Sequence, residues 1–168
     1  MEGILLEVLA RWLHFLGAIV WIGHNYATAV NRPRYEPLTA ADLADPDSPR
    51  QQALLAREHG TFRYASPVTL GSGLVILWQR GWLGDALSLQ GGLAPLGVGI
   101  WLGIAMVLNL WLVLWPNQKR VLGFVRATLE DRLRASRMTF LSARVNTLLS
   151  IPVLFLMAAG AHGLALFS

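Results

Sequence analysis

Residues 4–30 read ILLEVLARWLHFLGAIVWIGHNYATAV. This run is apolar apart from a few polar side chains, and it is longer than the roughly 20 residues that a helix needs to cross a bilayer. Three further apolar runs of similar length lie at about 62–83, 93–115 and 138–167. The sequence therefore predicts an all-α integral membrane protein, a four-helix bundle that forms a single membrane domain.

The composition also favours a membrane protein. Of the 168 residues, 54% are hydrophobic and 14% are charged, whereas soluble domains carry about 25% charged residues. The net charge is only +4, and the basic residues flank the apolar runs, so we expect no nucleic-acid partner. The chain has no cysteine, which excludes disulfides, iron–sulfur clusters and covalently attached haem.

The segments that connect the runs differ strongly in charge. Ten of the 14 Lys and Arg residues lie in segments 31–61 and 116–137, and the connection on the other side holds only Arg80. The positive-inside rule therefore predicts that both segments are cytoplasmic loops and that both termini lie on the non-cytoplasmic side. We expect a multi-pass protein of a bacterial inner membrane, in contact with lipid.

Both loops contain a predicted helix. The first loop is expected to be irregular up to Asp47, after which Ser48 caps a helix that has Pro49 at its first position and runs to about His59. In the second loop, apolar residues recur every four positions between arginines. This pattern predicts an amphipathic helix on the inner membrane face, between spans three and four. Its apolar residues are Val121, Val125, Leu129 and Leu133.

All four histidines lie within or beside the spans. At a rise of about 1.5 Å per residue, His14 and His24 differ in depth by roughly 15 Å. His14 and His162 fall in the outer half of the membrane, and His24 and His59 in the inner half. Two histidines from different helices can ligate a b-type haem in a bundle core, so these two tiers predict one or two haems. The alternative is that each histidine forms a hydrogen bond to a neighbouring helix.

Polar residues near these histidines are candidates for cofactor binding. Arg11 and Arg144 could pair with haem propionates, because guanidinium groups bind carboxylates in a bidentate manner. Otherwise Arg11 pairs with Glu7, and arginines near the membrane surface reach lipid phosphates. Asn146 and Asn109 predict a buried polar network in the neighbourhood of Arg144.

Several motifs resemble the membrane domain of the urate hydroxylase PuuD family, along most of the chain. They are Arg11-Trp12-Leu13-His14, Trp21-Ile22-Gly23, residues 103–109, Trp115-Pro116-Asn117-Gln118-Lys119-Arg120, residues 146–155 and His162. The resemblance implies a membrane b-type haem protein for electron transfer, linked to the oxidation of urate or a similar heterocycle. A cytochrome c or a membrane quinone would be its redox partner.

The chain departs from the long members of that family in three ways. It has no Cys-x-x-Cys-His motif for a cytochrome c domain. Gly97 and Val145 stand where long members often carry histidine. Haem binding and electron transfer are therefore better supported by the resemblance than urate oxidation is.

Three other interpretations stay open. Ser66-Pro67-Val68-Thr69 and residues 146–152 resemble HemJ, a short haem-binding membrane protoporphyrinogen oxidase. Direct oxidation of a flat heterocycle would require a proton acceptor, for which Glu7 and Glu58 are the carboxylates nearest to the spans. The chain could also be a structural or pigment-binding accessory subunit of a larger membrane complex, or form a homo-oligomer.

Overall fold

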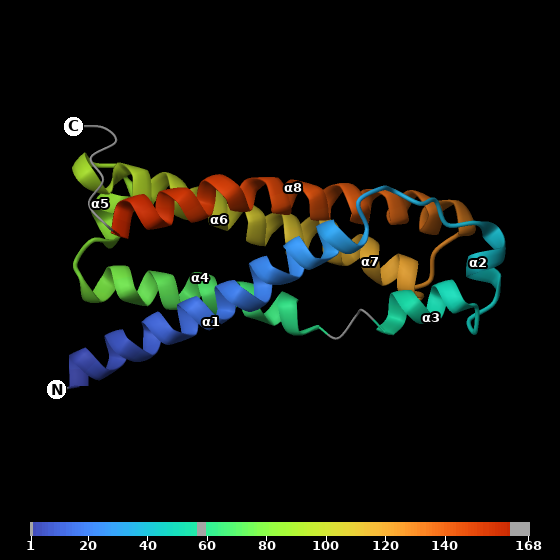
Figure 1. Ribbon diagram of the computed structural model, residues 1–168, viewed down its shortest axis with the longest axis horizontal. Helices are drawn as coiled ribbons and strands as arrows, with labels where there is room; N and C mark the ends of the chain where they lie inside the picture. Colours follow the sequence, from blue (N-terminus) through green and yellow to red (C-terminus); the bar gives the residue numbers. More distant parts are fainter. Residues whose placement is uncertain (1, 57–59, 162–168) are drawn as a thin grey trace.

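The computed structural model describes residues 2–56 and 60–161 (Figure 1). The longer helices are α1 (Glu2–Asn31), α4 (Thr61–Gln79), α6 (Ala94–Leu108) and α8 (Leu129–Ala161). The shorter ones are α2 (Ala40–Ala44), α3 (Pro49–Ala56), α5 (Leu83–Leu87), α7 (Trp115–Leu122), the 3₁₀-helix η1 (Gly91–Leu93) and the π-helix η2 (Asn109–Leu114). No strand occurs in this part of the chain, so the all-α prediction is confirmed for it.

Within the described residues, three helical stretches are long and apolar enough to cross a membrane: Gly3–Asn31, Gly91–Leu122 and Leu129–Gly160. They are the property expected of a membrane protein. The run predicted at 62–83 is the shorter helix α4, which ends at Gln79. Gly81 follows with a φ of +69°, in the left-handed region that favours glycine and stops a helix.

Helices α1 and α4 form the most extensive helix pair in the described part, and they cross along much of their length (Figure 1). The approach is close because the contact is lined by small residues. A Cβ on Gly17 would lie 2.5 Å from Thr69 Oγ1 and 3.3 Å from the Ala65 carbonyl oxygen. We call this contact, around Gly17, Ala65 and Thr69, the seam. Only glycine at position 17 allows the two backbones to lie this close.

The predicted loops 31–61 and 116–137 meet at one end of the molecule, which we call the basic end (Figure 1). Gln51 Nε2 donates to the Leu122 carbonyl oxygen at 3.4 Å, and Arg132 donates to the carbonyl oxygens of Leu43 and Val121. A small apolar core joins the same segments. It contains Leu38, Leu43, Val121 and Ala135. The two loops therefore pack on each other as a folded cap.

Helix α3 begins at Pro49, and the Gln51 N–H donates to Ser48 Oγ at 3.2 Å, so the predicted cap is confirmed. The segment before it was expected to be irregular, but it contains α2. Thr39 and Asp42 form a capping box there, in which each residue bonds the backbone N–H of the other.

The amphipathic helix predicted over 116–137 is wrong as a single element. Helix α7 ends at Leu122, because Gly123 takes a φ of +80°, and the chain is not helical again until α8 starts at Leu129. Val125 lies in the break. The predicted span at 138–167 therefore starts earlier than expected, and that at 93–115 ends later, since both extend into the predicted loop.

Buried amides join α8 to η2. Asn109 Nδ2 donates to Asn146 Oδ1 at 2.8 Å and to the Ser142 carbonyl oxygen at 2.9 Å, while Ser142 Oγ donates back to Asn109 Oδ1. Asn146 Nδ2 also donates to the Met106 carbonyl oxygen. The predicted network between Asn109 and Asn146 is thus confirmed. It satisfies the polar groups of these side chains inside an apolar bundle, where an unpaired amide would be costly.

Candidate functional site

His14 lies in the seam, where its ring orientation is fixed. Its Nδ1 donates to the Thr69 carbonyl oxygen at 2.8 Å. A carbonyl oxygen only accepts, so the proton sits on Nδ1 and Nε2 is the nitrogen with a lone pair. A Cβ on Gly73 would lie 2.9 Å from His14 Cε1, so glycine at position 73 makes room for the ring. This is the arrangement by which proteins orient a metal-binding histidine, and it is equally a satisfied interhelical hydrogen bond.

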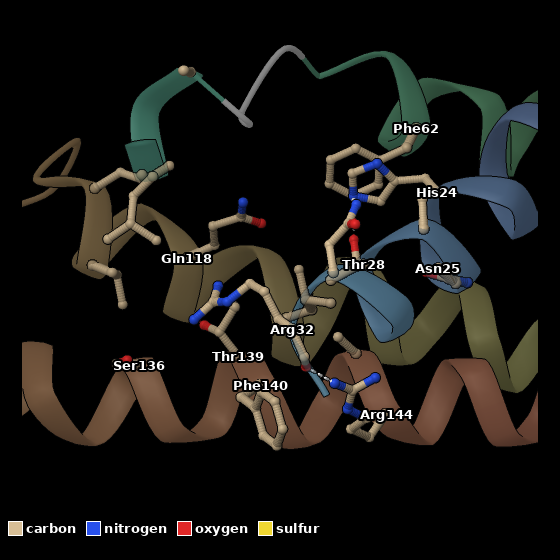
Figure 2. A pocket seen from close by; sticks show the side chains of 18 of the residues that line it. His24, Asn25, Thr28, Arg32, Phe62, Gln118, Ser136, Thr139, Phe140 and Arg144 are labelled. Carbon is tan, nitrogen blue, oxygen red and sulfur yellow. Dashed lines mark hydrogen bonds between the residues drawn. The ribbon is translucent and has the colours of Figure 1, made fainter. Parts of the chain in front are cut away.

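His24, further along the same helix, has a different environment. Its ring stacks on Phe62, with the ring centroids 4.0 Å apart and the planes 1° from parallel. Thr28 Oγ1, one turn later, lies 3.4 Å from His24 Nε2. Figure 2 shows the stacked rings above Thr28. His24 is thus held by contacts on one face and lines a cavity.

The cavity lies at the basic end and has a volume of about 420 Å³. This volume is in the range of binding pockets for small organic ligands. Residues from α1, α3, α4, η2, α7 and α8 surround it. The polar lining residues are His24, Asn25, Thr28, Asn31, Arg32, Gln118, Ser136, Thr139 and Arg144. The apolar lining residues are Ala27, Leu38, Leu54, Ala56, Phe62, Leu114, Val121, Leu122, Phe140 and Ala143.

Two arginines face each other across the lower part of the cavity (Figure 2). The Arg144 guanidinium donates to the Arg32 carbonyl oxygen and lies over the Phe140 ring, 4.7 Å from its centroid. The hydrogen bond and the aromatic ring both restrict the Arg144 side chain. The cavity therefore combines an imidazole, two guanidinium groups and a largely apolar wall.

Two polar atoms of the lining have no hydrogen-bond partner. They are Nδ2 of Asn25, a residue that is 6% exposed, and Oγ1 of Thr139. The Asn25 carbonyl oxygen lies 3.5 Å from Thr147 Oγ1, which fixes the backbone at this position. Buried donors without a partner cost about 1–3 kcal/mol each, so both atoms are groups that a ligand would satisfy.

The other predicted site residues lie elsewhere. Arg11 Nη2 is 2.6 Å from Glu7 Oε1, and Arg80 Nε is 3.0 Å from the same oxygen, at the end opposite the basic end. Asn146 belongs to the amide network and does not line the cavity. His59 and His162 lie outside the described residues. Of the seven predicted residues, the structure brings His24 and Arg144 to one cavity.

Sequence reasoning missed Arg32, Asn25, Phe62 and Thr139 as site residues. A signal for Arg32 was present, since His24, Thr28 and Arg32 follow at intervals of four and share one helical face. Thr139 carried no such signal, because only the packing of α8 against α1 brings it to the cavity.

Within residues 2–56 and 60–161, no three His, Asp or Glu side chains group together in a way that could hold a metal ion. Haem ligation differs from such a site, because the porphyrin supplies most of the iron ligands and the protein supplies axial ones. Comparison with family models, curated proteins and solved structures found no match to the chain.

Proposed function

We propose that the chain is an integral membrane protein that binds b-type haem and transfers electrons. One observation carries this proposal: His24 lines the same cavity as Arg32 and Arg144. Imidazole nitrogen is an axial ligand of haem iron, and arginine suits the propionate carboxylates at the edge of the porphyrin. The apolar wall suits the macrocycle itself. When bound, the haem would supply one-electron chemistry, while the residues of the cavity would orient it and exclude water.

In this proposal α4 is a fourth crossing, since its 19 residues reach about 28 Å at the rise of an α-helix. The basic end faces the cytoplasm of a bacterial inner membrane, because most of the Lys and Arg residues lie in its two loops. The N-terminus and the end of α8 lie on the other side. Haem bound near His24 would then be close to the cytoplasmic face.

A second haem would use His14. Its Nδ1 bond to Thr69 leaves Nε2 as the ligating nitrogen, which supports this role. His162 and His59 are proposed as the second ligands of the outer and inner haems. A cytochrome c or a quinone is proposed as the redox partner, and a link to oxidation of urate or a similar heterocycle follows from the PuuD resemblance alone.

The test is the absorption spectrum of the detergent-purified protein after haem loading, in the oxidised and reduced states. We expect a Soret band and split visible bands of a low-spin b-type haem. His24→Ala should remove or shift the band of the inner haem, and His14→Ala that of the outer one. Trp12→Ala, at a 62% exposed position on the same helix, is the control and should leave the spectrum unchanged. A protein that takes up no haem would refute the proposal.

One observation favours a second candidate, an accessory subunit of a larger membrane complex. Helix α1 leaves large apolar side chains exposed along its length, among them Ile4, Trp12 and Ile19. His14 is already hydrogen-bonded within the chain, and needs no metal in this interpretation. Co-purification of a stoichiometric membrane partner without any haem would support this candidate against the first.

A further inference from the structure

We propose that the cavity at the basic end binds the carboxylate or phosphate group of an amphiphilic ligand, with Arg144, Asn25 and Thr139 at the oxyanion. The apolar part of the ligand would contact the leucines and aromatic rings of the wall. This inference does not require iron or an axial histidine, so it stands independently of the haem proposal.

Arg144 provides the first argument. It lies within α8, a helix apolar enough to cross a membrane, and it is only partly exposed. Its contacts are the Arg32 carbonyl oxygen and the Phe140 ring, and no carboxylate in the described part of the chain forms an ion pair with it. A guanidinium in a region of low dielectric constant is stabilised by an anion. Carboxylate and phosphate match its planar fork of donors.

Asn25 provides a second and independent argument. Its side chain is about nine-tenths buried or more, being 6% exposed, and Nδ2 has no hydrogen-bond partner. Thr139, on α8, contributes a second lining group without a partner. Nδ2 and the hydroxyl are both donors. An oxyanion can accept from both and from Arg144 at once, which satisfies all three groups.

A route for the ligand comes from a second, smaller cavity. Its volume is about 330 Å³, and it shares Asn31, Arg32 and Leu54 with the first. Its own residues are mostly polar and include Arg50 and Glu36, whose charged atoms are 3.2 Å apart. The two cavities therefore adjoin at Arg32, and a charged ligand reaches Arg144 from the polar side of the basic end.

The test uses two ligand pairs that differ only in the oxyanion. Protoporphyrin IX is compared with its dimethyl ester, and oleate with methyl oleate, each titrated by fluorescence or its quenching against the detergent-purified full chain. Because hydrogen bonds to charged groups contribute about 1.5–3 kcal/mol, each acid that binds should do so about tenfold or more tightly than its ester. The pair that shows this preference identifies the source of the oxyanion.

Arg144→Gln should abolish most of the preference for the acid, and Arg144→Lys, which keeps the charge without the fork, should retain part of it. Arg134→Gln is the matched control on the same helix, since Arg134 is exposed and pairs with Glu130. Equal binding of acid and ester, no binding of either acid, or an unchanged preference in Arg144→Gln would each overturn the proposal. Haem uptake with an unchanged preference would overturn it and leave the proposed function standing.

Discussion

His14 and His24 lie on one helix, yet one is in the closed seam and the other beside a cavity. The seam consists of small residues, so the His14 ring contacts Gly73 and bonds the α4 backbone at Thr69. Around His24 the neighbours are long or aromatic side chains from several helices, which leave space between them. The comparison teaches that residue size on the facing helix decides whether a buried histidine is confined by packing or available to a ligand.

The largest effect is expected on the cavity side, from Phe62→Ala. Phe62 is 4% exposed, belongs to the main apolar core and stacks on His24. Loss of a buried phenylalanine costs about 3–5 kcal/mol, to be measured by thermal or denaturant unfolding in detergent. Tyr64→Ala, at a 63% exposed position on the same helix, should cost far less. Equal losses in the two variants would contradict the position of Phe62 in the core.

The seam is tested next, by Gly17→Ala. The added methyl would lie 2.5 Å from Thr69 Oγ1, so α1 must move away from α4, at a cost of about 1–3 kcal/mol. Gly23→Ala is the control on the same helix, because a Cβ there has no atom of the described part within 4 Å. The same unfolding measurement checks both, and a stable Gly17→Ala variant would show that the seam is looser than described.

Gly73→Ala sharpens the comparison at His14 itself. The new methyl would lie 2.9 Å from Cε1 and 3.0 Å from Nδ1 of His14, so the ring has to shift and its bond to Thr69 weakens. The net loss is about 0.5–1.5 kcal/mol, the contribution of one hydrogen bond. Nitrogen NMR of the imidazole reports the change directly. Gly71→Ala, with no described atom within 4 Å of its Cβ, should leave the His14 signal unchanged.

The smallest effect concerns the cap over the cavity and depends on pH. Hydrogen bonds from the Thr39 N–H and hydroxyl lower the pKa of the Asp42 carboxyl from its ordinary 3.8. The folded state therefore favours the charged form, and the stabilisation is complete above pH 3.8 and is lost as the pH falls through the lower folded pKa. Hydrogen exchange at Leu43 should rise over that range.

Asp42→Asn should remove this pH dependence and raise the exchange at Leu43 already at neutral pH. Asp47→Asn, in the same loop, is the control and should preserve the dependence. An exchange rate at Leu43 that follows the same pH curve in the parent chain and in Asp42→Asn would show that the capping box does not hold α2.

Features set by neighbouring residues were predictable from the sequence. Ser48 and Pro49 define the start of α3 because a cap acts within one turn of its own helix. The apolar runs likewise identified three helices long enough to cross a membrane. The break at Gly123 was missed, because the four-residue spacing of apolar residues continues across it and conceals the left-handed glycine.

The site was predictable only in part, because it depends on how helices pack. Arg144 and Asn146 were expected in one polar network, but residues two apart on a helix do not share a face. Asn146 therefore bonds Asn109 inside the bundle, while Arg144 lines the cavity. Asn25 and Thr139 come from helices far apart in sequence, and no local pattern brings them together.

The π-helix η2 has a consequence for how the chain tolerates length changes. A π turn holds one residue more than an α turn, so η2 is equivalent to a one-residue insertion in an otherwise regular helix. Deleting one residue within 109–114 would restore α geometry at that point instead of disrupting it. The helix after the deletion would, however, rotate by about 100° relative to the bundle. Val121 and Leu122 would then turn away from the cap and cavity, so the insertion sets the direction in which α7 presents them.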